Sequence, residues 1–209
     1  MQGVQSQALQ VTGDRAVFRN VRLLGNRNTL YAGSKDCASA TGQPCTPSRQ
    51  YFSKCYIEGS VDFISGDGRA VFDHCEIHST QHSTGSITAQ GKHYPEQESG
   101  FVFNHCTLTA EPGVTDLWLG RPWRPYASVV FLNTQMGGHI RPAGWQESHP
   151  GETNSIALAF FEEYNSSGEG AHPGERDSHC KQLSAEEAAR FEIRRFLAGP
   201  DQWDPTKHE

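Results

Sequence analysis

The sequence predicts an all-β protein, a right-handed parallel β-helix with a C-terminal helix. Three observations predict this fold: a seven-residue pattern that recurs five times, abundant glycine, and a final segment with helical signals. The chain has 209 residues, 21 of them glycine, and this length fits one domain with a buried core. Abundant glycine favours a turn-rich β architecture over a helical bundle. We expect the β-helix to span residues 1–180, and a capping helix and tail to span residues 181–209.

The recurring pattern consists of five segments that align without gaps. They begin at Val17, Tyr51, Val71, Val102 and Val130. The second position is phenylalanine in every copy: Phe18, Phe52, Phe72, Phe103 and Phe131. The fifth position is occupied by Val21, Cys55, Cys75, Cys106 and Thr134, and the seventh by Leu23, Ile57, Ile77, Leu108 and Met136. A polar residue between two inward positions follows the two-residue period of a β-strand.

The spacing between successive copies is 34, 20, 31 and 28 residues. Constant strands with variable insertions are typical of a solenoid whose loops project from one side. A β-sandwich with chance similarity between its strands is the alternative interpretation. The same phenylalanine in all five copies favours the β-helix.

The cysteines and histidines fall into the same repeat. Because Cys55, Cys75 and Cys106 share the fifth position, we expect an inward stack of reduced thiols. Two further cysteines, Cys37 and Cys45, flank a loop with glycine and proline and are candidates for a disulfide. Cys180 stands alone. The histidines at the fourth position, His74 and His105, are expected to face solvent.

The final segment carries helical signals. Ser184 and Glu187 form a capping-box pattern, in which Ser184 is the N-cap residue. The apolar run continues to Leu197 and stops at Gly199-Pro200. We expect this helix to cover the open end of the solenoid, where apolar surface and strand edges would otherwise be exposed.

Charge and hydropathy exclude two classes of partner. The net charge is −6 and no dense Lys/Arg cluster exists, which argues against nucleic acid. The sequence contains no run of about 18 apolar residues, so it predicts no membrane span. The N-terminus lacks a signal segment. Of the two interpretations, a truncated or processed chain and a cytosolic protein, we favour the first.

Two matching glycine segments point to chemistry. Gly25 and Gly59 each follow the seventh repeat position by two residues, and Asn28 and Asp62 each come three residues later. Equivalent residues of stacked coils lie about 4.8 Å apart, so both side chains are expected to share one cleft. Two carboxylates at such a separation shift one another's pKa and divide acid and base roles. This chain offers one carboxylate and one amide.

Several segments resemble the pectin methylesterase family. Residues 59–66 (GSVDFISG) resemble its nucleophile motif, and residues 119–123 (LGRPW) resemble its arginine motif. Three other segments match family segments in the expected order: residues 5–9 (QSQAL), 87–91 (ITAQG) and 142–145 (PAGW). The resemblance covers about residues 4–170 and implies a pectin-lyase-like solenoid. Family members usually carry further N-terminal coils.

The resemblance also implies a reaction. Asp62 would attack the methyl-ester carbonyl of a galacturonate unit and give an acyl-enzyme. Arg121 would hold that carboxylate ionised and oriented, and Gln5 would donate a hydrogen bond to the developing oxyanion. The resemblance implies no metal and no organic cofactor. Flat apolar surfaces for the sugar rings would come from Trp123, Tyr31, Trp145 and Phe63.

The chain departs from the family at the partner segment. The family pattern is Gln-Asp-Thr-Leu-Tyr, whereas residues 27–31 read Arg-Asn-Thr-Leu-Tyr. The family's aspartate protonates the departing methanol and then activates water, but Asn28 cannot exchange a proton at neutral pH. General acid–base help contributes ~10²–10⁴-fold, so a large loss of rate is expected. Arg27 offers a donor in place of the family's glutamine, and Ser65 thins the apolar wall where the family usually has phenylalanine.

We therefore expect a pectinesterase-type carbohydrate esterase that is weakened or inactive. A non-catalytic homologue that binds pectin or polygalacturonate is the first alternative, and an esterase or thioesterase with a changed substrate is the second. The expected partner is pectin, a homogalacturonan polysaccharide, with neither nucleic acid nor membrane. We expect a monomer, and the resemblance places it outside the cell or in the periplasm.

Overall fold

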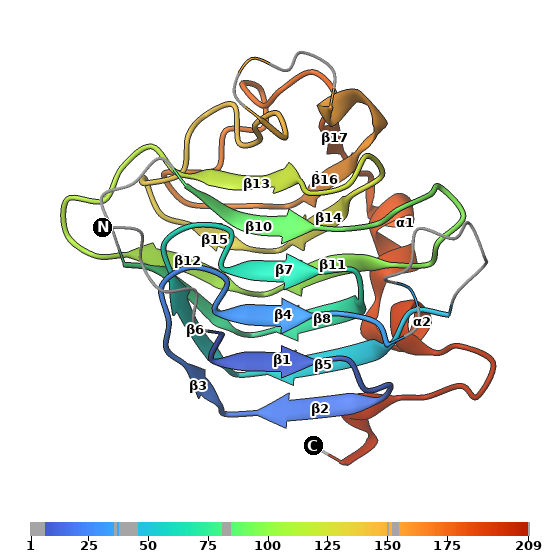
Figure 1. Ribbon diagram of the computed structural model, residues 1–209. Helices are drawn as coiled ribbons and strands as arrows, with labels where there is room; N and C mark the ends of the chain where they lie inside the picture. The colour runs from blue at the N-terminus through green and yellow to red at the C-terminus, as the bar shows by residue number, and fades with distance from the viewer. Residues whose placement is uncertain are drawn as a thin grey trace.

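A computed structural model describes residues 7–35, 37, 46–80, 85–149, 151 and 155–208. Its strands form three parallel sheets that wind into a β-helix, so the predicted fold is confirmed (Figure 1). The first sheet contains β1 (Leu9–Val11), β4 (Leu30–Ala32), β7 (Ile64–Gly66), β10 (Ser86–Gln90) and β13 (Trp118–Pro122). The second contains β2 (Ala16–Arg19), β5 (Arg49–Ser53), β8 (Arg69–Asp73), β11 (Gly100–Asn104), β14 (Ser128–Leu132), β16 (Phe160–Tyr164) and β17 (Lys181–Gln182). The third contains β3 (Arg22–Leu23), β6 (Tyr56–Gly59), β9 (Glu76–Ser79), β12 (Thr107–Ala110) and β15 (Gln135–Met136).

The repeated phenylalanines form a continuous stack inside the second sheet. The register pairs each one with its equivalent on the next coil. The ring centroids of Phe72 and Phe103 lie 4.5 Å apart, and those of Phe103 and Phe131 lie 4.6 Å apart. Each ring therefore packs against the equivalent ring of the next coil. Because the stack is continuous, phenylalanine at this one repeat position helps to set the register of five coils.

The repeat cysteines are also stacked inside the core. Cys55, Cys75 and Cys106 are free thiols with at most 2% of their surface exposed, as the shared position predicts. A hydrogen bond with Cys75 and burial both raise the pKa of the Cys55 thiol. Cys180 is a free thiol with partial exposure. Cys37 is disulfide-bonded, but Cys45 lies outside the described residues, so the predicted pairing stays a prediction.

Thiol labelling of the folded protein is expected to be limited to about one fast-reacting cysteine per chain. Cys180 is the partly exposed free thiol among the described residues, whereas the three stacked thiols are at most 2% exposed and therefore closed to reagent. Burial raises the pKa of the Cys180 thiol, so it should react ahead of the stacked thiols but more slowly than a fully exposed cysteine. A chromogenic disulfide reagent measures the count, and Cys180→Ser is the control that should remove the fast phase. Rapid labelling of two or more thiols in the native state would contradict the stack.

The segment from 183 to 208, here called the C-terminal strap, runs along the outside of the second sheet (Figure 1). It contains α1 (Ala185–Ala188), η2 (Ala189–Phe191), α2 (Ile193–Leu197) and η3 (Pro205–His208); η1 (Ile156–Leu158) precedes β16. The predicted capping box is confirmed, because Ser184 accepts from Glu187 N–H and the Glu187 carboxylate accepts from Ser184 N–H. The expected single helix is instead broken at Glu192, whose ψ of 138° is extended.

The expectation that this helix covers the open end of the solenoid is wrong. Apolar strap residues pack on outward-facing residues of the second sheet, and four of these, one from each of four coils, share a repeat position. These outward residues occupy the first repeat position: Tyr51, Val71, Val102 and Val130. Both faces of this sheet are therefore apolar, and the outer one requires a cover.

Arg49 fastens the strap to the first coils. Its guanidinium donates to both carboxylate oxygens of Asp14 at 2.9 and 2.8 Å, and to Ala198 O at 2.8 Å. It also pairs with Asp201 at 2.5 Å, although only 7% of the Arg49 surface is exposed. Gly199, at φ +59°, leaves the room for this guanidinium, since a Cβ there would lie 2.4 Å from Nη1. Residues far apart in sequence are thus joined at one buried cation.

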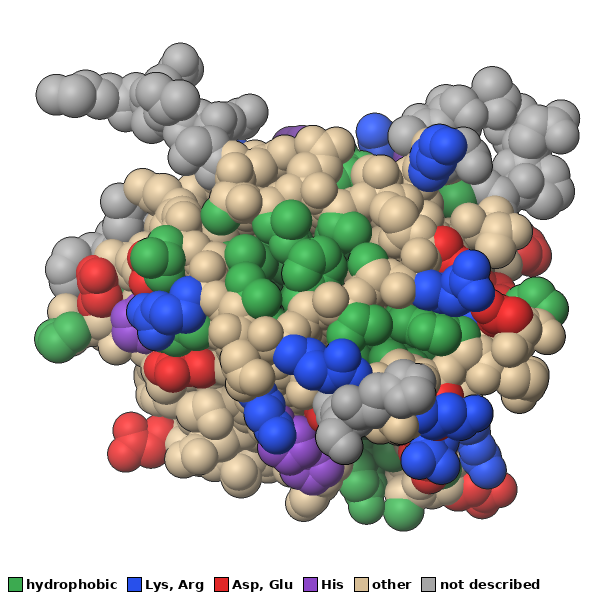
Figure 2. Space-filling view, turned by 90° about the horizontal axis from the view of Figure 1, so that it is seen from below, with side chains coloured by type: hydrophobic (Ala, Val, Ile, Leu, Met, Phe, Trp, Pro, Cys, Tyr) green, Lys and Arg blue, Asp and Glu red, His purple; other side chains and the backbone are tan. Residues whose placement is uncertain are grey.

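The outermost coil of strands, β1 to β3, presents apolar side chains at one end of the solenoid (Figure 2). Leu9, Phe18 and Val21 are only partly buried there, whereas the phenylalanines of the inner coils are fully enclosed. Among the described residues, no helix has the length and apolar character to cross a bilayer.

Candidate active site

One row of side chains crosses the outer face of the first sheet. Tyr31 pairs with Ser65, Ser65 with Ala89, and Ala89 with Arg121, so four consecutive coils each contribute one residue. These four residues form part of the lining of a cavity of about 300 Å³. The remaining lining residues are Gln7, Arg27, Asn28, Asp62 and Trp123. The parallel register of the first sheet therefore builds this cavity.

Asn28 and Asp62 lie at the same turn of adjacent coils. Both adopt the left-handed conformation, at φ 54° and 49°, which asparagine and aspartate tolerate better than most residues. Each N–H bonds to the next coil: Asn28 donates to Val61 O at 3.4 Å, and Asp62 donates to Ser86 O at 2.6 Å. A bridge between Arg27 and Val61 sets the register of the two turns. The prediction that both face one cleft is confirmed.

The glycines of the motif provide room for these turns. A Cβ on Gly25 would lie 2.4 Å from Thr29 Oγ1, and a Cβ on Gly59 would lie 2.3 Å from the Phe63 Cβ. In each coil the glycine thus lets the side chain four residues later pack across the turn. The sequence spacing between glycine and Asn or Asp follows from this packing.

Asp62 and Arg121 form a bidentate ion pair at the base of the cavity. Arg121 Nε donates to Oδ1 at 3.0 Å, and Nη2 donates to Oδ2 at 2.7 Å. The third nitrogen, Nη1, donates to Ser148 O at 2.9 Å and fixes the guanidinium plane. The side chains of Asp62 and Arg121 are 6% and 18% exposed, so this pair is screened little by solvent. The arrangement holds one oriented carboxylate facing a solvent-connected cavity.

Two aromatic side chains flank this carboxylate. The Trp123 ring is 40% exposed and meets Tyr31 edge-on, with centroids 6.3 Å apart. Gly91 allows this position, because a Cβ there would lie 2.9 Å from the indole. Burial and the charge of Asp67 raise the pKa of Tyr31 above its ordinary value, so its phenol stays protonated at neutral pH. Both rings line the cavity, as predicted for surfaces that contact a sugar.

Two other predicted substrate contacts are wrong. Trp145 is 2% exposed and stacks on Phe161, with centroids 4.0 Å apart, inside the solenoid. Its bridge to Gly120 turns the indole toward the core and away from the outer face. Phe63 is fully buried, because residues 62 and 63 alternate between outside and inside. Neither ring can present a face to a ligand.

The oxyanion candidates have different outcomes. Gln5 lies outside the described residues, so its role stays a prediction. Arg27 lines the cavity from the turn that also carries Asn28. Gln7 lines it as well and was missed by sequence reasoning. A signal was available, because Gln7 belongs to the QSQAL segment that resembles the family. Two arginines against one aspartate give the cavity lining a formal charge of +1.

Comparisons with known proteins agree with this geometry. The family model described as pectinesterase matches residues 1–200. Pectinesterase 31 of Arabidopsis thaliana is 37% identical over 201 residues, which cover 96% of this chain and 58% of that protein. The chain spans about half the length of the curated relatives it matches.

Solved structures give the same result. The pectin methylesterase from carrot superposes with a TM-score of 0.76 at 28% identity, over 90% of this chain and 58% of its own. A pectin methylesterase in complex with a hexasaccharide superposes with a TM-score of 0.66 at 28% identity, over 93% of this chain and 59% of its own. With a family model that covers nearly the whole sequence, the chain belongs to the pectinesterase family.

Proposed function

We propose that this chain is a carbohydrate esterase that hydrolyses methyl esters of galacturonate in pectin, with turnover reduced by Asn28. One observation carries the proposal: Asp62 is held by two hydrogen bonds from Arg121 and faces the cavity between Trp123 and Tyr31. A carboxylate oriented in this way is a competent nucleophile toward an ester carbonyl. The exposed Trp123 face is suited to packing against a sugar ring.

The reaction is an acyl transfer in two steps. An Asp62 oxygen forms a bond to the ester carbonyl carbon, and the bond from that carbon to the methoxy oxygen breaks. The departing methoxide takes a proton from water, because Asn28 has no acidic proton to give, and it leaves as methanol. Water then attacks the acyl-enzyme, releases the galacturonate carboxylate and restores Asp62. Arg121 orients the nucleophile throughout, and Arg27, Gln7 and the predicted Gln5 are candidate donors to the oxyanion. The scheme requires neither a metal nor an organic cofactor.

Other parts of the proposal follow from the same residues. The substrate is homogalacturonan, whose free uronates suit a cavity lining with a formal charge of +1. A disulfide-bonded Cys37 favours an oxidising compartment, in keeping with an extracellular or periplasmic location. We propose that the protein acts as a monomer.

Methanol release from methyl-esterified pectin tests the proposal. Asp62→Asn is expected to reduce the rate to the uncatalysed background, because the nucleophile is removed. The substitution suits the fold, since Asn28 holds the equivalent left-handed turn one coil earlier. We expect the Asn28→Asp variant to react faster, so comparing it with the double variant Asn28→Asp/Asp62→Asn makes the loss of methanol release easier to measure. Unchanged methanol release after Asp62→Asn in that background would refute the nucleophile assignment.

Binding without catalysis is the second candidate function. Arg27 favours it, because a second arginine in the lining is suited to a free carboxylate, which is the product rather than the ester. Calorimetry with polygalacturonate separates the two functions. Binding without methanol release from any variant supports a polysaccharide-binding protein, whereas release by the Asn28→Asp variant supports the esterase.

A further inference from the structure

A ladder of left-handed turns runs along the second sheet, on a different face from the active-site cavity. In the second sheet, each strand from β2 to β16 is followed by one residue with φ between 50° and 54°, and each of these residues up to Asn133 donates its N–H to the next coil. We call this row the turn ladder: Asn20, Lys54, His74, His105, Asn133 and Asn165. Its fixed backbone places equivalent side chains one coil apart.

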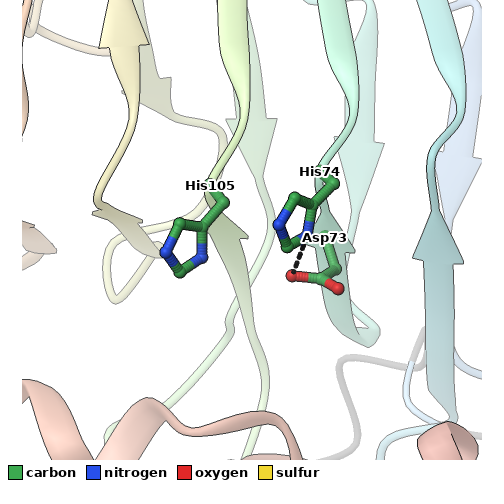
Figure 3. Close-up of side chains that lie close together, drawn as sticks. All are labelled: Asp73, His74 and His105. Atoms are coloured by element: carbon green, nitrogen blue, oxygen red, sulfur yellow. Dashed lines mark ion pairs between the residues drawn. The ribbon is translucent and has the colours of Figure 1, made fainter.

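Two consecutive positions of the turn ladder are histidines. The rings of His74 and His105 lie parallel, with centroids 5.0 Å apart and an interplanar angle of 9° (Figure 3). Asp73, which precedes His74, places Oδ1 3.1 Å from His74 Nδ1. One potential ligand atom from each of the three residues lies within 4.8 Å of the others. Both imidazoles are exposed, which leaves them free to tilt toward a shared ion.

Two hydrogen bonds from neighbouring side chains position the Asp73 carboxylate. Tyr51 Oη donates to Asp73 Oδ2 at 3.0 Å, and Asn104 Nδ2 donates to Oδ1 at 2.9 Å. The Asp73 side chain is only 8% exposed, so these bonds hold it in one orientation. Outer hydrogen bonds of this kind orient metal ligands and hold their geometry before the ion arrives.

The donor set has a chemical preference. Two imidazoles and one carboxylate suit zinc, copper and nickel, whereas calcium and magnesium require more oxygen ligands. Three protein ligands leave further coordination positions to water. Lys54, on the preceding position of the ladder, is an exposed cation and opposes binding to a small extent.

We propose that Asp73, His74 and His105 form a surface site for a divalent transition-metal ion of the zinc or copper class. The site belongs to the second sheet and takes no part in ester hydrolysis. Zinc chloride titrated into untagged, chelator-treated protein in a calorimeter is expected to show one site per chain. Copper bound at the same site is expected to show nitrogen coupling in its electron paramagnetic resonance spectrum.

Asparagine substitutions test the two histidines without disturbing the turns, because Asn20, Asn133 and Asn165 already occupy ladder positions. His74→Asn and His105→Asn are each expected to weaken zinc binding at least tenfold, with an unchanged melting temperature of the metal-free protein. Asp73→Asn is expected to weaken it as well.

His179→Asn is the matched control. His179 is an exposed histidine that lies 2.9 Å from Asp177. Among the described residues it belongs to no group of three potential metal ligands, so its loss should leave zinc affinity unchanged. Absence of zinc binding by the unmodified chain would overturn the proposal. Zinc affinity in both histidine variants equal to that of the unmodified chain, or loss of the site in His179→Asn, would also overturn it.

Discussion

Asn28→Asp is expected to raise methanol release by ~10²-fold or more, the usual contribution of general acid–base catalysis. Methoxide is a poor leaving group unless it receives a proton as the bond to the carbonyl carbon breaks. Among the described residues that line the cavity, the uncharged group with an ionisable proton is Tyr31, whose raised pKa makes it a weak acid. An aspartate at 28 places a carboxyl on the coil next to Asp62, where the two carboxylates can divide the acid and nucleophile roles.

The measurement is initial-rate methanol release from methyl-esterified pectin at equal protein concentration. Asn20→Asp is the control, because Asn20 is an exposed left-handed turn residue outside the cavity. Ser65→Phe, which restores the apolar wall, is expected to change the rate far less than Asn28→Asp. If the Asn28→Asp variant is no faster than the unmodified chain, another group delivers the proton and the role given to position 28 is wrong.

Arg176→Met is expected to lower the free energy of unfolding by about 3–5 kcal/mol. Glu163 lies on β16 in register with Phe131, so it takes the inward position that phenylalanine occupies on the earlier coils. Arg176 Nε donates to its Oε1 at 2.6 Å, and both side chains are 2% exposed. The same guanidinium donates to Pro142 O and Gly170 O. Removing it leaves a buried carboxylate and two carbonyls without their partner.

Chemical denaturation followed by tryptophan fluorescence measures this loss. Arg195→Met is the control. Arg195 pairs with Glu192 at 3.8 Å, and the two side chains are 66% and 64% exposed, so the loss of this pair should cost no more than about 1 kcal/mol. The double variant Arg176→Met/Glu163→Leu is expected to recover much of the stability, because an apolar pair needs no counter-charge. Equal losses of unfolding free energy from Arg176→Met and Arg195→Met would contradict the importance of burial.

The parts of the structure that repeat were predictable from sequence. Phenylalanine, as at Phe72, and cysteine, as at Cys75, recur at fixed repeat positions, and stacking of the repeats must bring equivalent residues together. The shared offset of Asn28 and Asp62 from their glycines likewise placed both at one cleft. The physical reason is the same in each case. In a parallel register, residues at the same repeat position lie side by side on neighbouring coils.

The parts that depend on irregular segments were not predictable. The Glu163–Arg176 pair joins a strand to a loop with no repeat of its own, so no periodic signal exists for it. Trp145 was misplaced because a single bridge to Gly120 decides which way the indole points. The position of the C-terminal strap had an unused signal: the first repeat position is apolar, so the outer face of the second sheet needed a cover.

The Arg49 junction has a consequence for synthesis of the chain. Coils of a solenoid can stack in the order in which they leave the ribosome, because each contacts its neighbours. Arg49, however, joins Asp14 to Asp201, so its network closes only after residue 201 has emerged. Until then the apolar outer surface around Val71 and Val102 stays open to other nascent chains. Translation pauses before the strap therefore lengthen the exposure of an aggregation-prone sheet, and chaperone demand should be highest between the emergence of the last coils and that of the strap.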